Sequence, residues 1–385
     1  MQQMGEILVQ LVRNEVCGIP LDFADDVQFT DRCLADLLIL AGKHDVSHIV
    51  ASSLLRNALL KDSSLEGVFR EEIYTAVFKY EKTAAVFNDI CVTFEAENIP
   101  YIPLKGMVVR ELYPQPCMRN SRDIDILVKK DDVSSAVNLI CEKNNFAVFN
   151  SGEHDITLKS PDGIFVEIHF ALLGNKKSPL YSDLLENVWE SAHHIEGCRY
   201  ALDEKTAYYY HVLHMAKHFR IGGCGFRPFL DLWFIDNNTL LDEAEILSVF
   251  EENNLILFFT NVRKLSKVWF GSEIHDEVTL AMQEYIFEGG SFGSSVTRMV
   301  SQQHTSGGKL RYIISRVFVP IKQLKAEYPV LEKFIFFTPF CMIHRWLSLL
   351  FGEKKDIRKK QIKYANNVSK KHINDINLLF ERVGL

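Results

Sequence analysis

Two aspartates, Asp123 and Asp125, stand two positions apart in DIDILV, where acidic and aliphatic residues alternate. A period of two is typical of a strand, and residues two apart on a strand point to the same face. The two carboxylates therefore leave one face together, and they repel each other unless a cation lies between them. Magnesium suits such a pair, because it binds one or two protein carboxylates and fills its octahedron with phosphate and water. The alternative is a solvated strand edge, since Asp-x-Asp alone is a weak signal.

A third carboxylate, Glu167, stands among apolar neighbours in IFVEIHF, a segment that is also typical of a strand. If this strand pairs beside the aspartate strand, the three carboxylates meet. Three carboxylates on neighbouring strands can hold two metal ions for in-line phosphoryl transfer. His169 shares the face of Glu167, and it either orients that carboxylate or packs as a hydrogen-bonded residue of the core.

A lysine and a glycine, Lys105 and Gly106, follow a short apolar segment and precede a short predicted helix. Glycine allows close approach of the backbone, and a helix N-terminus is a natural phosphate site. Lys105 would add a mobile positive charge. Lys-Gly by itself is common, so this signal depends on its neighbours.

Three histidines, His211, His214 and His218, recur at spacings of three and four in one predicted helix and share a stripe. The stripe could bind zinc, face a catalytic cleft or pack by hydrogen bonds. Zinc is the weakest of these interpretations, because no fourth ligand is visible. Asp231 is expected to pair with a basic residue of this region or with Arg227, and a buried ion pair is the plain alternative.

The elements that must position these residues form an α+β pattern. Residues 99–174 are expected to be the core with a mixed sheet: a strand, a helix, a strand, a helix and then further strands. Residues 1–98 and 175–385 are expected to be helical regions on either side. The longer helices are expected at 68–98, 131–144, 205–220, 227–237, 242–254, 255–268 and 274–287.

The composition is that of a globular protein, with 385 residues of which 47% are hydrophobic and 24% charged. The formal charge of −7 gives no nucleic-acid signature. Eight cysteines without a Cys-x-x-Cys pair argue against a zinc knuckle or a disulfide framework. The N-terminus is too charged for a signal peptide, and the apolar segment 334–350 is too interrupted for a transmembrane segment. A cytoplasmic protein is expected, with a peripheral membrane contact at 334–350 as the lesser alternative.

The stretch IPYIPLKGMVVRELYPQPCMRNSRDIDILV, followed by VEIHF, resembles bacterial nucleotidyltransferase-family proteins of the polymerase-beta superfamily. It is most similar to a branch with an LKG…YP…R…DIDLLV pattern, over residues 99–171 and on through HMAKH and FLDL. The resemblance implies a polymerase-beta-like core and transfer of a nucleoside monophosphate from an NTP, such as ATP, to an acceptor hydroxyl. It also implies that Mg²⁺ or Mn²⁺ binds at Asp123, Asp125 and Glu167.

The same resemblance assigns further residues. Lys105 and Gly106 stand where the wider superfamily has a Gly-Ser loop that holds the triphosphate. Arg119 matches the arginine of the branch, and a planar guanidinium suits phosphate. The acceptor pocket is expected from the following residues: His214, Lys217, His218, Arg227 and Asp231.

Three alternatives accompany this interpretation. One is a noncatalytic nucleotide-binding or regulatory protein on the same core, which the change from Gly-Ser to Lys-Gly permits. Another is a glycosyltransferase, which also uses Asp-x-Asp but normally places it after a long nucleotide-binding region. The third is a component of a toxin–antitoxin or defence system. The acceptor, the preferred base and the oligomeric state stay open, and a homo-oligomer is compatible with the sequence.

Overall fold

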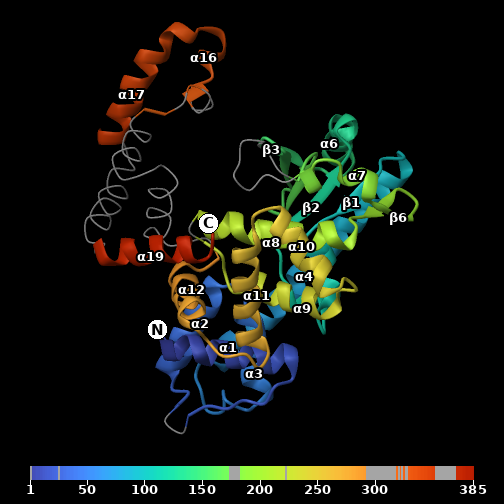
Figure 1. Cartoon of the computed structure of the whole chain (residues 1–385). Coiled ribbons are helices and arrows are strands. Elements are labelled where there is room, and N and C mark those ends of the chain that lie inside the picture. Colours follow the sequence, from blue (N-terminus) through green and yellow to red (C-terminus); the bar gives the residue numbers. More distant parts are fainter. Residues whose placement is uncertain are drawn as a thin grey trace.

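The structure is a computed structural model and describes residues 2–24, 27–172, 183–221, 223–291, 318–319, 321, 324–325, 328–351 and 370–385. A sheet lies at one end of the body, the N-terminal helices lie at the other, and further helices pack between them (Figure 1). This arrangement confirms the α+β class. The polar segment 296–308 and the second half, 292–295, of the Gly/Ser-rich segment 288–295, which the sequence predicts to be a flexible connection, lie outside the described residues. Among the described residues, no helix has the length and apolar character of a membrane span.

Within the described residues, seven strands form one mixed sheet in the order β3-β4-β5-β2-β1-β7-β6. The pairs β2·β5 and β1·β7 are parallel, and the other neighbours are antiparallel. The aspartate strand β2 is central and almost wholly buried. The strands are β1 (Tyr101–Pro103), β2 (Asp123–Val128), β3 (Ala147–Ser151), β4 (Asp155–Lys159), β5 (Phe165–His169), β6 (His193–Glu196) and β7 (Arg199–Ala201).

The last two strands extend the sheet beyond the predicted core. β7 pairs with β1 through Tyr101 and Arg199, so the expectation of helices alone after residue 174 is wrong here. β6 is exposed along its whole length, and β7 is half-buried. Strands this short and this exposed leave no alternation of apolar residues from which they could be predicted.

The helices surround the sheet and build the rest of the body, and those expected from the sequence are present. Before and within the sheet lie α1 (Gln2–Cys17), α2 (Asp31–Lys43), α3 (Ser47–Arg56), α4 (Glu66–Ala96), α5 (Gly106–Val109) and α6 (Val133–Lys143). After it lie α7 (Val188–Ser191), α8 (Glu204–Arg220), α9 (Arg227–Asn238), α10 (Glu243–Glu252), α11 (Ile256–Phe270), α12 (Glu277–Gly289), α16 (Val330–Lys333), α17 (Thr338–Phe351) and α19 (Lys370–Arg382). Short 3-10 turns are η1 (Arg110–Leu112), η2 (Pro116–Met118), η3 (Lys130–Asp132), η4 (Asp183–Leu185) and η5 (Ile335–Phe337).

Two apolar clusters make up the main core. One lies under the sheet, where Ile90 and Phe94 of α4 pack with β2, β5 and α6. The larger one joins the N-terminal helices to α8, α9, α11 and α12, and it contains the stacked rings of Phe226 and Trp269, with centroids 4.6 Å apart. The site strands and the helical region are therefore packed as one body.

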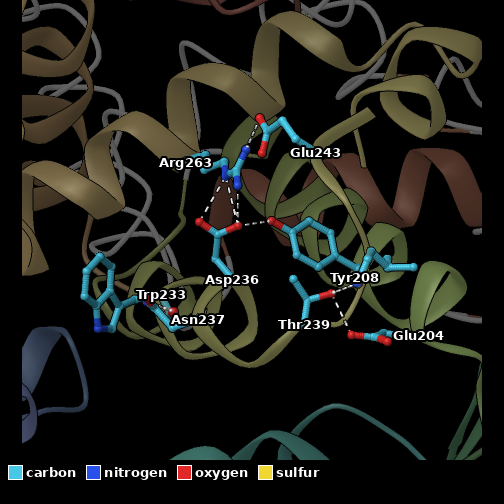
Figure 2. A network of polar contacts seen from close by, with 9 residues as sticks. Glu204, Tyr208, Trp233, Asp236, Asn237, Thr239, Glu243 and Arg263 are labelled. Atoms are coloured by element: carbon cyan, nitrogen blue, oxygen red, sulfur yellow. Dashed lines mark hydrogen bonds and ion pairs between the residues drawn. The ribbon is translucent and has the colours of Figure 1, made fainter. Parts of the chain in front are cut away.

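A polar network fixes α8 among its neighbours (Figure 2). Arg263 of α11 donates to Asp236 of α9 at 2.9 Å, and Tyr208 of α8 donates to the same carboxylate at 2.9 Å. Arg263 also reaches Glu243 of α10 at 2.6 Å. Arg263 and Asp236 thus link the helices α8, α9, α10 and α11, and this network holds α8 in place beside the sheet.

Two buried histidines join the N-terminal helices to the rest of the chain. His44 Nδ1 accepts a hydrogen bond from the Phe226 backbone N–H at 3.2 Å, and His48 Nε2 donates to the Met118 carbonyl at 2.8 Å. Burial lowers the pKa of each ring to about 4. Both histidines are therefore neutral in the folded protein at pH 7.

The histidine His48 is expected to make folding pH-dependent. Its pKa is depressed in the folded state, so its contribution is present above about pH 6.5 and is lost as the pH falls from 6.5 towards 4. His48→Gln keeps a donor for the Met118 carbonyl but cannot titrate. Between pH 7 and pH 5 the wild type should lose about 2 kcal/mol more unfolding free energy than this variant, measured by urea denaturation. The exposed His194→Gln variant should follow the wild type, and an identical loss in His48→Gln would contradict the assignment.

Candidate active site

The strands β2 and β5 bring the carboxylates together. They run in parallel, and their register sets Asp125 opposite Glu167. Ligand atoms of Asp125, Glu167 and His169 all lie within 4.8 Å of one another. The Asp123 side chain points from the same face of β2. The negative charges of Asp125 and Glu167 act on its carboxyl group. We call these three acidic residues, Asp123, Asp125 and Glu167, the carboxylate cluster.

The turn after β1 aims Lys105 at the carboxylate cluster. The Leu104 backbone N–H donates to the Asp125 carbonyl at 3.0 Å and ties this turn to β2. Lys105 then adopts a φ of +42°, a left-handed conformation that is uncommon for a residue with a side chain. Its Nζ atom donates to Asp125 Oδ1 at 2.8 Å. The strained turn thus places an ammonium group against the carboxylates.

His169 is the other partner of Asp125. Its Nε2 atom lies 2.9 Å from Asp125 Oδ1 and 3.4 Å from Glu167 Oε2. Burial lowers the pKa of His169, but the hydrogen bonds to Asp125 and Glu167 outweigh burial and hold it above its ordinary value. Nε2 is therefore the donor in these contacts. The spacing of two from Glu167 was the sequence signal for this residue.

Charge is distributed unequally within the carboxylate cluster. Burial raises the pKa of Asp125, yet Lys105 and His169 outweigh burial and hold it well below its usual range. Burial, and then the neighbouring Asp125 carboxylate, raise the pKa of Asp123 to about 6. Asp125 is therefore ionised. The repulsion between the carboxylates acts on Asp123, whose protonated form it favours.

Arg119 and Asp231 form a buried ion pair. Arg119 Nε and Nη2 lie 2.8 and 2.7 Å from the two Asp231 oxygens, and the Tyr113 hydroxyl donates to Asp231 at 2.6 Å. Arg119 is 6% exposed and Asp231 is 2% exposed. The buried ion pair is therefore favoured over phosphate binding by Arg119 and over an acceptor contact by Asp231. Buried opposite charges are stabilised when they pair, as Arg119 Nε and Nη2 do with the Asp231 carboxylate.

Gly106 is packed tightly against this pair. A Cβ atom at Gly106 would lie 2.7 Å from Arg119 Nη1 and 3.0 Å from Ser121 Oγ. The Gly106 carbonyl accepts from Arg110 Nε at 2.8 Å, and Arg110 Nη2 donates to Ser121 Oγ. Because α5 has only four residues, it also provides little helix dipole for phosphate. Close packing therefore explains why residue 106 is a glycine, and Lys105 supplies the positive charge of this turn.

α8 presents basic and histidine side chains towards the cluster. The Tyr210 ring centroid lies 6.0 Å from Lys105 Nζ, and the Nε2 atoms of His214 and His218 lie 3.1 Å apart. Burial, and then the charges of Lys217 and Lys105, lower the pKa of His218 to about 4. One ring of the pair must donate and the other accept, as neutral imidazoles do.

The other predicted site residues, His211, Lys217 and Arg227, lie in three different environments. His211 contacts the Pro228 carbonyl at 3.0 Å and packs between helices, so the three histidines do not act as one set. Lys217 is exposed, and partial burial followed by the charge of Lys105 lowers its pKa, against the opposing charges of Asp155 and Glu167. Arg227 donates to the Asn120 carbonyl at 2.5 Å, which ties α9 to the segment before β2.

Among the described residues, the group suited to a metal is Asp125, Glu167 and His169. No histidine of α8 belongs to a three-ligand group within the part of the chain that the structure describes. This favours the sheet face over the histidine stripe as a metal site.

Comparison with known proteins gives one family match and one similar solved structure. The family described as "Uncharacterised nucleotidyltransferase" matches residues 33–271, a span that includes all seven strands and the helices from α3 to α11. Comparison with curated proteins gives no match. A solution structure of the antibiotic-resistance factor ANT(2'')-Ia is similar at 10% identity and a TM-score of 0.35, over 45% of this chain and 91% of that chain.

Proposed function

This chain belongs to the nucleotidyltransferase family that matches residues 33–271, and from this premise we propose that it transfers a nucleoside monophosphate from an NTP to an acceptor hydroxyl. The observation that carries the proposal is the parallel pairing of β2 with β5, which gathers the carboxylate cluster beside Lys105. Family membership also favours this reaction over the glycosyltransferase alternative.

The donor set of the carboxylate cluster fits a divalent cation. Carboxylate oxygens are the ligands that Mg²⁺ and Mn²⁺ prefer. Asp125 Oδ1 is taken by Lys105 and His169, so Asp125 Oδ2, Asp123 and Glu167 are the oxygens that would hold the ion. The raised pKa of Asp123, caused by burial and then by Asp125, reflects an excess of negative charge that a divalent cation would relieve. When bound, the ion would neutralise charge on the transferring phosphoryl group.

In the proposed reaction the acceptor oxygen bonds to the α-phosphorus, and the bond from that phosphorus to the bridging oxygen breaks. Pyrophosphate leaves, and the acceptor proton must pass to a base. Glu167 is the best candidate, because its side chain is 29% exposed whereas that of Asp125 is 4% exposed and already accepts from two donors. His169 holds Glu167 Oε2 at 3.4 Å and would orient it as the proton arrives.

The α8 side chains are proposed to bind the anionic groups of the substrates. Lys217 is the exposed cation of this helix, and His214 and His218 lie one turn apart beside it. We keep these three residues and Arg227 in the proposed acceptor pocket. Asp231 is removed from it, because its carboxylate is buried on Arg119.

Lys105 is proposed to exchange its bond with Asp125 for a bond with the triphosphate, and Gly106 shapes the turn that carries it. Lys105→Met should then weaken ATP and GTP binding by about tenfold while slowing the bound reaction less, because the charge acts on ground and transition states alike. It should tighten Mg²⁺ binding without nucleotide, because the carboxylates lose an internal cation. Calorimetry measures both affinities.

These two shifts have opposite signs, so a partly unfolded variant cannot produce them together. The exposed Lys130→Met variant is the control and should match the wild type in both titrations. Unchanged ATP and Mg²⁺ affinities in Lys105→Met would rule out a phosphate role for this lysine.

The bond between Lys105 and Asp125 also favours the second candidate, a nucleotide-binding protein without turnover, because an ammonium group holds an oxygen that a metal could use. Incubation of the pure protein with each labelled NTP, Mg²⁺ and cell extract separates the two. Label transferred to one acceptor from one NTP, and absent with Asp125→Asn, supports the enzyme. Nucleotide binding by calorimetry without transfer of label from any NTP would support the noncatalytic candidate.

A further inference from the structure

The face of the sheet that carries the carboxylate cluster continues beyond it onto β5 and β4. In the parallel pairing of β2 with β5, Asp123 lies opposite Phe165. In the antiparallel pairing of β5 with β4, Phe165 lies opposite Lys159. Residues that are paired directly across neighbouring strands point to the same face of a sheet. Phe165 and Lys159 therefore extend the row of side chains that begins at Asp123.

A second phenyl ring, Phe149, joins this row from the edge strand β3. The register between β3 and β4 shifts between Val148 and Asn150, so strand pairing does not decide the face of Phe149. Ring contacts decide it. The centroids of Phe149 and Phe165 lie 5.4 Å apart, and Lys159 Nζ lies 5.6 Å from the first and 5.3 Å from the second. We call Phe149, Phe165 and Lys159 the aromatic platform.

The aromatic platform is open to solvent and is not part of the core. Phe149 is 63% exposed, and Lys159 is exposed as well. The core beneath the sheet is built by the next residues along each strand, Leu158 and Val166, which point to the opposite face. Core packing therefore does not account for the Phe149 ring. Exposed rings beside a positive charge are typical of a surface on which planar ligands stack.

The aromatic platform and Lys105 lie on opposite sides of the carboxylate cluster. In the sheet, β1 lies on one side of β2, whereas β5, β4 and β3 lie on the other (Figure 1). Lys105 follows β1 and is the residue proposed to bind the triphosphate. In-line transfer needs the attacking oxygen and the leaving pyrophosphate on opposite sides of the phosphorus. With the donor phosphates on the Lys105 side, the acceptor approaches from the platform side, past the proposed base Glu167 on β5.

Lys159 gives the aromatic platform a positive charge. In the part of the chain that the structure describes, its ammonium group contacts the two phenyl rings and no carboxylate. A ligand with both a planar ring and an anionic group matches this surface. Neighbouring strands lie roughly 4.8 Å apart, so the backbones at Lys159 and Asp123 are roughly 10 Å apart, a distance that one nucleotide can bridge.

Resting on the proposed nucleotidyl transfer, we propose that the aromatic platform binds the acceptor and that this acceptor is a nucleotide. Its heteroaromatic base stacks on Phe149 and Phe165, its phosphate pairs with Lys159, and its sugar hydroxyl reaches the carboxylate cluster. The formal charge of −7 repels a long polyanion, so a mononucleotide is favoured over a long nucleic acid.

Calorimetry with the donor site filled tests the proposal. The full chain is first saturated with Mg²⁺ and a nonhydrolysable ATP analogue. Adenosine 5′-monophosphate (AMP), adenosine or ribose 5-phosphate is then titrated into this complex. AMP should bind at least about tenfold more tightly than either of the other two, because AMP alone carries both the base and the phosphate.

Two variants each remove one half of the aromatic platform. Phe149→Ala should weaken binding of AMP and adenosine by about tenfold and leave ribose 5-phosphate unchanged, because only a base stacks on the ring. Lys159→Gln should weaken binding of AMP and ribose 5-phosphate by about fivefold and leave adenosine unchanged, because only a phosphate pairs with the ammonium group. A misfolded variant would weaken all three ligands alike. Phe78→Ala and Lys130→Gln, at exposed residues outside the platform, are the matched controls and should bind like the wild type.

Absence of AMP binding would overturn the proposal, as would AMP binding that is unchanged in both Phe149→Ala and Lys159→Gln. Transfer of label to an acceptor in cell extract would in that case leave the proposed function standing. Platform-dependent AMP binding without transfer of label from any NTP would instead support the aromatic platform as a nucleotide site and contradict the proposed reaction.

Discussion

Replacing Asp125 with asparagine is expected to lower nucleotidyl transfer by about a thousandfold or more. The change is nearly isosteric, but it removes the charge from a carboxylate whose oxygen lies within 4.8 Å of ligand atoms of Glu167 and His169. Losing one carboxylate from a metal site removes several kcal/mol of charge stabilisation in phosphoryl transfer, which corresponds to that factor in rate. Transfer of labelled nucleotide at saturating Mg²⁺ measures the effect.

The same substitution is also expected to destabilise the folded protein, by about 3 kcal/mol. The two adjacent aspartates alone would suggest the opposite sign, because removing one charge relieves their repulsion. The structure changes this expectation, since Asp125 is the buried partner of both Lys105 and His169. Urea denaturation at pH 7 measures the loss. Adding Lys105→Met to Asp125→Asn should restore part of it, because the unpaired ammonium is removed as well.

A matched control separates the site from a general change in charge. Asp131→Asn removes an exposed carboxylate just beyond β2 and should leave both transfer and stability near wild type. Folded Asp125→Asn protein that retained Mg²⁺-dependent transfer would refute the assignment of this residue, whatever its stability.

Removing the Asp231 carboxylate should have the largest effect on stability of the changes considered. Asp231→Ala would leave the Arg119 guanidinium buried without its partner and the Tyr113 hydroxyl without its acceptor. Breaking a buried pair from one side costs about 3–5 kcal/mol. Since this pair joins α9 to the segment before β2, the loss should appear as lower stability of the whole protein in urea denaturation.

A paired substitution distinguishes a structural role from a phosphate role. Arg119→Met combined with Asp231→Leu removes both charges and should recover most of the stability lost in Asp231→Ala. If the pair is structural, this double variant should also bind ATP normally by calorimetry. A stable double variant that no longer binds ATP would show that Arg119 contacts phosphate after all, and wild-type stability in Asp231→Ala would contradict the buried pair.

Local patterns in the sequence were sufficient for the elements that carry the candidate site. Alternation along DIDILV predicts that Asp123 and Asp125 share a face, and the same rule relates Glu167 to His169. The strands β1 to β5 and the helix α8 lie where the sequence pattern placed them, within a few residues. These features depend on neighbours two to four positions away, so backbone geometry decides them before any distant contact forms.

The other features of the candidate site depend on tertiary structure, mainly on contacts between segments that are far apart in the sequence. The pairing of β2 with β5 joins Asp125 to Glu167, and the left-handed turn at Lys105 sets where its ammonium points. The partner of Arg119 lies 112 residues away, so no local pattern could tell a phosphate-binding arginine from one buried on Asp231. By itself the sequence determined which side chains of the site strands share a face and where the longer helices and the strands β1 to β5 lie. Only the tertiary structure decided which charges meet, because buried charges take the partners that packing brings within hydrogen-bond distance.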